Sequence, residues 1–377
     1  MSRLPFIIVA LHAYVGARLV PDLPWGVIGM LAGAAVLAAS AWLIPFGFGA
    51  RRRASGSTQP RLTWAGLLAM GAFSTLFVLT ALRDAALLIA TVVAWAGVDL
   101  PLDAIARDTA VAVPLLTLLI TALGYVNARR VARVRNVDVP IAALPAALHG
   151  FTIVQISDVH IGPTIGRDYL EAIVASVNAL DADVVAITGD LVDGSVRQLA
   201  LHIEPLARLE SRHGTYFVTG NHEYYSGVRA WMTELRRLGL NILVNEHVVL
   251  EHEGASLVLA GVTDFGAHHY DAAHRSDPDA ALAGAPGDAG AKVLLAHQPR
   301  SAIAAARAGF DLQLSGHTHG GQFLPWNFFV RFQQPFTAGL ARLGALWVYT
   351  SRGTGYWGPP KRFGAPSEIT RVRLVTA

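Results

Sequence analysis

Residues 151–160 read FTIVQISDVH, a largely apolar run that ends in Asp158 and His160. A short run rich in β-branched residues predicts a buried strand, and here the polar residues follow directly at the carboxyl end of that strand. In α/β sheets, ligands bind at the carboxyl ends of the strands. The stretch therefore predicts an α/β domain with a polar site at one edge of a sheet.

The same pattern recurs four times in the next 160 residues. DVVAIT (183–188) precedes GDLVD (189–193), TYFVT (215–219) precedes GNHE (220–223), KVLLA (292–296) precedes His297, and LQLS (312–315) precedes GHTHGGQ (316–322). Glycines beside the polar residues let the backbone turn sharply and approach a ligand closely. Five loops would thus deliver Asp, Asn and His side chains to one rim.

Further periodic segments lie between and after these strands. We expect helices over residues 167–180, 196–210 and 227–238, and strands over 240–250, 256–262, 345–350 and 371–375. This order predicts an α/β domain with its strands in two packed sheets flanked by helices.

The first third of the chain is chemically different. Charged residues make up 15 % of the whole sequence, against roughly 25 % in an ordinary soluble domain, and hydrophobic residues make up 53 %. Four apolar segments fill this third: 5–20, 25–49, 62–82 and 109–128. About 20 apolar residues span a bilayer as a helix, so we expect about four spans. The alternative, a buried hairpin of core helices, does not suit three uncharged runs of this length. The stretch Ala85–Val98 is too short to span comfortably and is interpreted as an extension of the third helix or as an interfacial segment.

Arginine placement predicts the orientation. Two connections carry clusters without acidic residues: Arg51, Arg52, Arg53 and Arg61 in one, and Arg129, Arg130, Arg133 and Arg135 in the other. Cytoplasmic loops are enriched in such residues. We therefore expect a multi-pass protein of the inner (cytoplasmic) membrane, with both termini and the catalytic domain on the cytoplasmic side. The expected organisation is a membrane region over 1–136, a linker over 137–150 and the α/β domain over 151–377.

The charge distribution and the absence of cysteine limit which partners and which metal ligands are expected. The formal net charge is +3, but the arginines cluster beside apolar runs, so the bilayer is the expected partner and nucleic-acid binding is not expected. Cysteine is absent, which leaves His, Asp, Glu or Asn to hold any metal ion. Two divalent metals about 3.5–4 Å apart can clamp a phosphate and activate water. The strand-end residues offer the imidazoles and hard oxygens that such a centre needs.

The ordered motifs resemble those of the calcineurin-like metallophosphoesterases, whose pattern is D-x-H, G-D-x-x-D, G-N-H-[DE], H and G-H-x-H. The match covers roughly residues 147–377 and is most similar to the membrane-associated YkuE/YaeI-like branch, whose ending resembles YTSRGTG (349–355) and RFGAP (362–366). The resemblance implies an α/β/β/α fold, a β-sandwich flanked by helices, and two divalent metal ions. The donor set does not choose among Mn, Fe, Zn and Mg.

The resemblance also implies a role for each ligand. A first metal ion would be held by Asp158, His160 and His319. A second would be held by Asn221, His297 and His317. Asp190 would bridge the two ions.

Catalytic and substrate-binding roles follow in the same way. His222 would contact the phosphate and protonate the leaving oxygen, with Asp193 orienting it; a side chain one residue after a ligand suits a general acid. Asn221 would also face the substrate. Arg352 and Arg362 could bind a substrate phosphate, and salt bridging inside the domain is the alternative.

Two features stay open in the sequence. His268 and His269 lie in a loop that we interpret as solvated, with substrate contact at the rim as the rival. The aromatic run 323–336 is either core or an apolar surface that touches lipid or an acyl chain.

Together these features predict a membrane-anchored, binuclear metal-dependent phosphoesterase. It would hydrolyse a phosphodiester or pyrophosphate bond by attack of metal-bound hydroxide, and a lipid-linked or nucleotide-linked substrate is a candidate. The alternative is a metal-binding membrane sensor or scaffold with a non-catalytic domain. A transporter with a regulatory hydrolase would need buried ionisable residues in its spans. Oligomeric state is not predicted.

Overall fold

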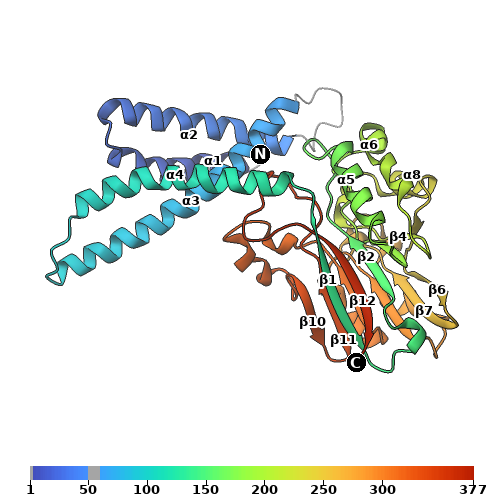
Figure 1. Cartoon of the computed structure of the whole chain (residues 1–377). Helices are drawn as coiled ribbons and strands as arrows, with labels where there is room; N and C mark the ends of the chain where they lie inside the picture. Colours follow the sequence, from blue (N-terminus) through green and yellow to red (C-terminus); the bar gives the residue numbers. More distant parts are fainter. Residues whose placement is uncertain (1–2, 50–59) are drawn as a thin grey trace. The chain divides into compact units, whose positions relative to one another are not determined.

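The computed structural model describes residues 3–49 and 60–377. Contacts divide the chain into a helical unit (Met1–Asn127 with Gly358–Lys361) and an α/β unit (Ala128–Trp357 with Arg362–Ala377). Figure 1 shows the long helices of the first unit and the strands of the second. Arg51, Arg52 and Arg53, on which part of the orientation prediction rests, lie outside the described residues.

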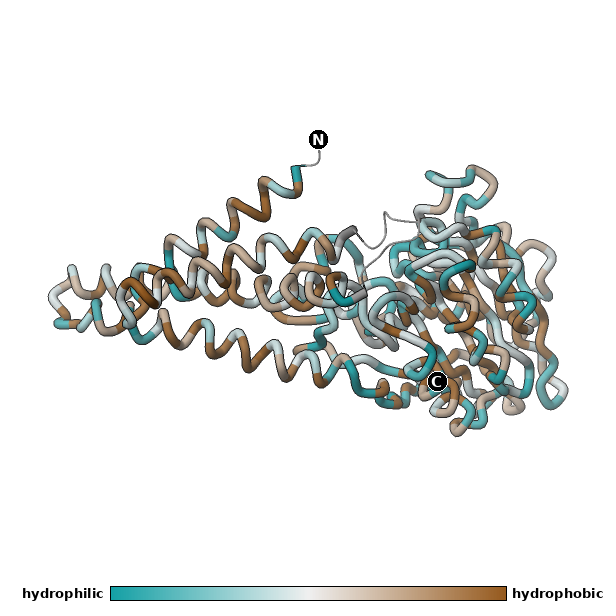
Figure 2. The backbone as a smooth tube through the Cα atoms, turned by 90° about the horizontal axis from the view of Figure 1, so that it is seen from above, coloured by the Kyte–Doolittle hydropathy of each residue, from teal (hydrophilic) through white to brown (hydrophobic). Residues whose placement is uncertain are grey.

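The helical unit consists of long apolar helices. They are α1 (Leu4–Leu19), α2 (Gly26–Gly49), α3 (Pro60–Trp95) and α4 (Leu102–Arg129). All four are long and apolar enough to cross a membrane, and Figure 2 shows many hydrophobic segments along the long helices, interrupted by less hydrophobic ones. Large apolar side chains such as Ile28 (80 % exposed) and Leu118 (66 % exposed) cover their outer surfaces. Such surface is stable in lipid and unfavourable in water.

The third helix includes the stretch that the sequence left ambiguous. With 36 residues, α3 is about 54 Å long at 1.5 Å per residue and exceeds a hydrocarbon core of about 30 Å. Ala85–Trp95 therefore continues this helix, as the first interpretation predicted. The preceding Arg83 and Asp84 point to different partners: Arg83 is buried and paired with Asp22, whereas Asp84 accepts from Arg18 and Tyr14.

The α/β unit contains two mixed sheets, as predicted. In the first, the order is β1 (Arg133–Ile141), β12 (Glu368–Thr376), β2 (Thr152–Ile156), β3 (Val184–Ile187), β4 (Thr215–Phe217) and β5 (Asn241–Ile242). In the second, it is β10 (Gly339–Leu343), β11 (Leu346–Thr350), β9 (Leu312–Ser315), β8 (Ala291–Leu295), β7 (Ala255–Gly261) and β6 (Glu246–His252). Strands β2 to β5 run parallel, as do β7, β8, β9 and β11.

Three differences from the predicted strands have simple causes. The first residues of the predicted linker belong to β1, in which only Val139 and Ile141 are buried and the preceding residues are charged or polar at four of six positions. The expected strand 240–250 is two strands, because Asn245 turns the chain with a positive φ of 53°. Strand β10 was not predicted; its glycine start and its arginine obscure the alternation.

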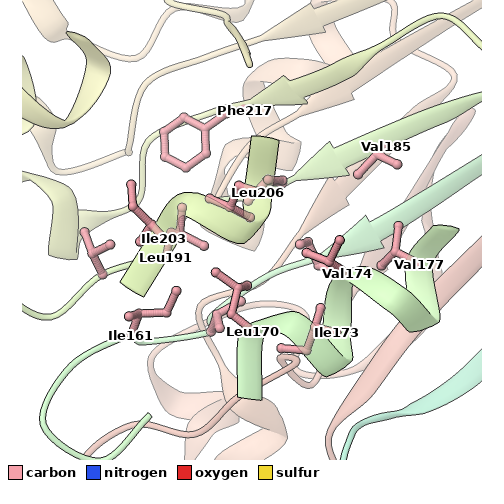
Figure 3. Packing of buried hydrophobic residues seen from close by; sticks show 14 of the residues in the cluster. Ile161, Leu170, Ile173, Val174, Val177, Val185, Leu191, Ile203, Leu206 and Phe217 are labelled. Carbon is pink, nitrogen blue, oxygen red and sulfur yellow. The ribbon is translucent and has the colours of Figure 1, made fainter. Parts of the chain in front are cut away.

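Alternation along each strand builds two cores. Val185 and Ile187 of β3 face the helices, where they pack with Leu170, Ile203 and other residues shown in Figure 3. Their neighbours Val184 and Ala186 face the second sheet and pack with residues of β7, β8 and β9. Successive side chains of a strand point to opposite faces of the sheet. A strand that is apolar at every position is therefore expected to be buried on both faces.

Helices complete the outer layers. The α/β unit contains α5 (Arg167–Asn178), α6 (Val196–Ile203), α7 (Asn221–Ser226), α8 (Val228–Arg237), α9 (Pro278–Leu282) and α10 (Ala302–Ala308). Residues of α5, α6 and α8 pack on the first sheet, and residues of α9 and α10 pack on the second. The result is the predicted α/β/β/α arrangement, which leaves the strand ends of both sheets free to carry a site.

Candidate metal centre

The predicted ligands all follow parallel strands at the carboxyl end. Asp158 and His160 follow β2, Asp190 follows β3, and Asn221 begins α7 after β4. On the second sheet, His297 follows β8, and His317 and His319 follow β9. Loops from five strands thus place polar side chains above a rigid frame.

One cluster joins the two sheets through Asp158, His160 and His319. The Nε2 atoms of His160 and His319 are 3.0 Å apart, and His319 Nε2 lies 3.5 Å from Asp158 Oδ1. All three side chains are buried. Two imidazole nitrogens and a carboxylate oxygen thus converge on one point, as ligands of a divalent cation do.

A second cluster contains Asp190, His297 and His317. His297 Nε2 is 3.1 Å from His317 Nδ1 and 3.2 Å from Asp190 Oδ2. The same Oδ2 lies 3.9 Å from His160 Nε2 of the first cluster, so Asp190 faces both. The other ring nitrogen of His297 donates to the carbonyl of Thr188 at 2.8 Å, which orients Nε2 toward the cluster.

An unsatisfied acceptor indicates what the site holds. Asn221 Oδ1 is buried and has no hydrogen-bond partner. A buried polar atom left in this state costs about 1–3 kcal/mol. A cation would satisfy it, and the next residue, His222, donates its backbone N–H to Asp190 of the second cluster. The His and Asp side chains of the two clusters are the nitrogen and oxygen mixture that divalent metals take. The residues therefore fit the two metal ions that the resemblance implies.

Backbone strain is concentrated in these loops. Asp158, His160, Asp190, His317 and His319 all have positive φ, between 51° and 72°. Non-glycine residues rarely adopt this region, and such strain gathers at functional sites where the surrounding structure enforces it. Five of the seven predicted ligands therefore sit on a backbone that local preference alone would not select.

Glycines make the close approach of the loops possible. A Cβ added at Gly220 would lie 2.2 Å from Asp190 Oδ1, and one added at Gly316 would lie 2.2 Å from Asp158 Oδ2. No side chain fits at either position without displacing a predicted ligand.

Burial and neighbouring charges set the protonation states. Burial and the nearby His297 lower the pKa of His317 to about 3. Burial and His160 hold the pKa of His319 well below its usual value. Burial opposes the ionised form of Asp190, but the His297 imidazole holds the pKa of this carboxyl well below its usual range. The neutral imidazoles of His317 and His319 and the Asp190 carboxylate are the forms in which these groups bind metal. Burial opposes the charged form of His297, but Asp190 raises the pKa of this imidazole well above its usual value.

His222 and Asp193 lie beside the clusters. His222 Nδ1 is hydrogen-bonded to Asp193 Oδ1, and its Nε2 is 3.8 Å from Asp190 Oδ2. The His222 backbone N–H donates to Asp190 Oδ1 at 2.8 Å. The His222 ring is thus oriented by one carboxylate and presents its other nitrogen to the site.

Glu223 is a residue whose role the sequence reasoning missed. Its buried carboxylate accepts from the backbone N–H groups of Asp190, Leu191 and Gly220 at 2.7–3.0 Å. It joins the loop after β3 to the loop after β4. Burial and Asp190 raise the pKa of Glu223 to about 7. Glu223 is the last residue of the GNHE motif, so the sequence did mark it as a site residue. No sequence pattern indicates whether such a carboxylate accepts hydrogen bonds from the backbone or binds metal.

The two arginines proposed to contact substrate have partners inside the domain. Arg352 is 3.0 Å from Glu368, which is the alternative that the sequence left open. Arg362 is buried and donates to the carbonyl of His319 at 2.9 Å, with its Nη2 3.1 Å from His319 Nδ1. The Arg362 contacts hold the loop that carries His319. A role of Arg352 and Arg362 in phosphate binding stays a prediction.

The structure describes the aromatic run 323–336 and the His268–His269 loop, whose roles the sequence left open. In the aromatic run, Trp326, Phe328, Phe329 and Phe332 are 40–75 % exposed, whereas Phe336 packs against the second sheet's outer core. The rings of His268 and His269 lie 4.0 Å apart and are tilted by 41°; His268 is half-buried and His269 is exposed.

Two mixed sheets between helices, with clustered His and Asp side chains at their strand ends, define a metal-binding α/β/β/α domain. Residues 151–321 match the family described as calcineurin-like phosphoesterase. A Bos taurus "Transmembrane protein with metallophosphoesterase domain" is 42 % identical over 275 residues, covering 70 % of this chain and 62 % of that protein. An "Uncharacterized metallophosphoesterase" of Aquifex aeolicus is 32 % identical over 224 residues, covering 59 % of this chain and 84 % of that protein.

The "Uncharacterized metallophosphoesterase YkuE" of Bacillus subtilis is 28 % identical over 241 residues, covering 61 % of this chain and 81 % of that protein. The chain belongs to the calcineurin-like metallophosphoesterase family. It spans 62 % and 63 % of the length of the transmembrane relatives from Bos taurus and Danio rerio that it matches.

Proposed function

We propose that the chain is a membrane-anchored phosphoesterase that uses two divalent metal ions to hydrolyse a phosphodiester or pyrophosphate bond. The observation that carries the proposal is the pair of His/Asp clusters that Asp190 faces, together with the buried and unsatisfied Asn221 Oδ1. Membership of the family makes a metal-dependent phosphoester hydrolase the expected class. The choice of diester or pyrophosphate rests on family resemblance.

The proposed mechanism divides the work between the cations and His222. When bound, the cations would polarise the phosphoryl oxygens and activate water for attack on phosphorus. Asp193 holds Nδ1 of His222, so the proton available for the leaving oxygen is on Nε2. Proton transfer from this atom would leave a neutral imidazole, whose Nδ1 stays hydrogen-bonded to Asp193.

A metal-reload assay tests the activity. Detergent-purified full-length protein would be stripped and reloaded with Mn, Zn, Fe or Mg, and assayed on bis-p-nitrophenyl phosphate beside p-nitrophenyl phosphate. We expect metal-dependent diester cleavage that Asp190→Asn abolishes. Two bound metals without turnover on either compound would favour the sensor alternative. No bound metal in any reload would contradict the ligand assignment.

The aromatic turn after the metal loop suggests a lipid-linked substrate. An added Cβ at Gly321 would lie 2.2 Å from Asn327 Cα, so the turn packs directly on the loop that carries His319. Phe328 and Phe332 project from this turn with 59 % and 75 % exposure. Exposed aromatic rings beside a phosphate site suit an acyl or prenyl chain, and the candidate spans keep the protein near such substrates.

Kinetics on matched substrates test the lipid proposal. The double variant Phe328→Ser/Phe332→Ser should raise KM for a long-chain lipid pyrophosphate about tenfold, the effect of losing part of two buried rings. Turnover of a soluble diester should stay unchanged. Ile303→Ser, which alters an equally exposed apolar residue on α10, is the control. Equal kinetics of the double variant and the parent on the long-chain compound would contradict the proposal.

A further inference from the structure

A second group of metal-ligating side chains lies away from the candidate centre. Asp183, His213 and His252 place one ligand atom each within 4.8 Å of one another. Asp183 precedes β3, His213 precedes β4, and His252 ends β6. The five residue-to-residue steps from Asp183 to Thr188 span roughly 16 Å of strand, so this group lies at the opposite end of the sheets.

The spacing of the ligand atoms matches a metal site. His213 Nε2 is 3.1 Å from His252 Nδ1, which is 3.8 Å from Asp183 Oδ1. Ligands of a tetrahedral zinc ion with bonds of about 2.0–2.1 Å stand about 3.3 Å apart. The candidate catalytic clusters show the same spacing, with facing imidazole nitrogens 3.0 and 3.1 Å apart.

Surrounding residues orient all three side chains. Asp183 Oδ2 accepts from the backbone N–H and the hydroxyl of Thr152 at 2.8 and 3.0 Å, which directs Oδ1 toward His252. The buried Phe151 stacks on the His213 ring and meets the His252 ring edge-on. The exposed Arg212 lies 3.9 Å from Asp183 Oδ1 and 3.8 Å from Glu253 Oε1.

We propose that Asp183, His213 and His252 form a structural zinc site that joins the two sheets, with water as the fourth ligand. Asp183 and His213 precede strands of the first sheet and His252 ends a strand of the second, so the ion would cross-link the two sheets. The donor set of two imidazoles and one carboxylate is typical of zinc. The rival arrangement is a plain hydrogen bond between two neutral rings.

Zinc titration of full-length protein tests the site. We expect His213→Gln and Asp183→Asn each to bind one zinc equivalent fewer than the parent and to lose part of the zinc-dependent rise in Tm. His202→Gln, which alters an exposed histidine on α6, should keep the full count. Diester turnover should stay within twofold of the parent in all three variants, because the site is remote from the predicted catalytic residues. An identical zinc count in all four proteins would overturn the proposal.

Chemical modification of the parent protein tests the same site without relying on variants that fail to fold. Zinc should protect His213 from diethyl pyrocarbonate while His202 reacts equally with and without the ion. Equal modification of His213 under both conditions would overturn the site even if the catalytic centre is metal-loaded. Loss of turnover with protection intact would instead count against the proposed function alone.

Discussion

Asp190 is the residue on which both candidate metal clusters depend. Its Oδ2 faces His297 at 3.2 Å and His160 at 3.9 Å, and its Oδ1 accepts the His222 backbone N–H. Asp190→Asn keeps the size of the side chain and removes its charge. We therefore expect loss of bound metal and of diester turnover together, measured by elemental mass spectrometry and by the nitrophenolate assay. Full metal content in this variant would contradict a bridging role.

His222 should behave in the opposite way. Its ring is oriented by Asp193 and is not among the predicted ligands. His222→Ala should keep the parental metal content and lose roughly 10²–10⁴-fold in kcat, the usual contribution of a general acid. The same two measurements separate it from Asp190→Asn. Unchanged turnover would remove His222 from the mechanism.

Gly220 tests the geometry of the backbone. The Cβ of Gly220→Ala would meet Asp190 Oδ1 at 2.2 Å, so the carboxylate must move away from His297. We expect reduced metal affinity and lower turnover without unfolding. Metal titration measures the affinity, and circular dichroism checks that the protein stays folded. Gly287→Ala is the matched control, because nothing lies within 4 Å of its Cβ and its φ is not positive. Equal metal affinity in the two variants would show that the loop can absorb the side chain.

At the scale of elements, Glu223 ties the loop after β3 to the start of α7. It accepts three backbone N–H groups, whereas the amide of Glu223→Gln offers a single acceptor oxygen. We expect metal affinity to fall about 10–100-fold, as is typical when a group that supports a ligand is altered. Isothermal titration with Mn or Zn measures the change. Parental affinity would show that the loops hold their shape without this carboxylate.

The strand ends were predictable, but the strain within them was not. Apolar runs that end in Asp, His or Asn indicate both the strand and the edge at which it stops, so the convergence of Asp158, Asp190 and His297 follows from α/β topology. The positive φ of Asp158 and His317, and the use of Glu223 as a backbone acceptor, depend on contacts between distant loops. No local pattern carries that information.

Strand β1 was missed for the same reason, because its pairing with β12 joins residues more than 230 positions apart.

At the scale of the whole molecule, the four candidate spans make a topology prediction. With four crossings, we expect the connection between α3 and α4 on the side of the membrane opposite to the α/β unit, for which the arginine clusters predict a cytoplasmic location. The chain has no cysteine, so a single introduced thiol is unique. In intact cells, a membrane-impermeant maleimide should label Asp99→Cys in this connection and should label Ala207→Cys on the α/β unit only after permeabilisation. The reverse pattern would place the proposed hydrolase outside the cytoplasm, and its substrate would then be a phosphoester on the outer leaflet or beyond it.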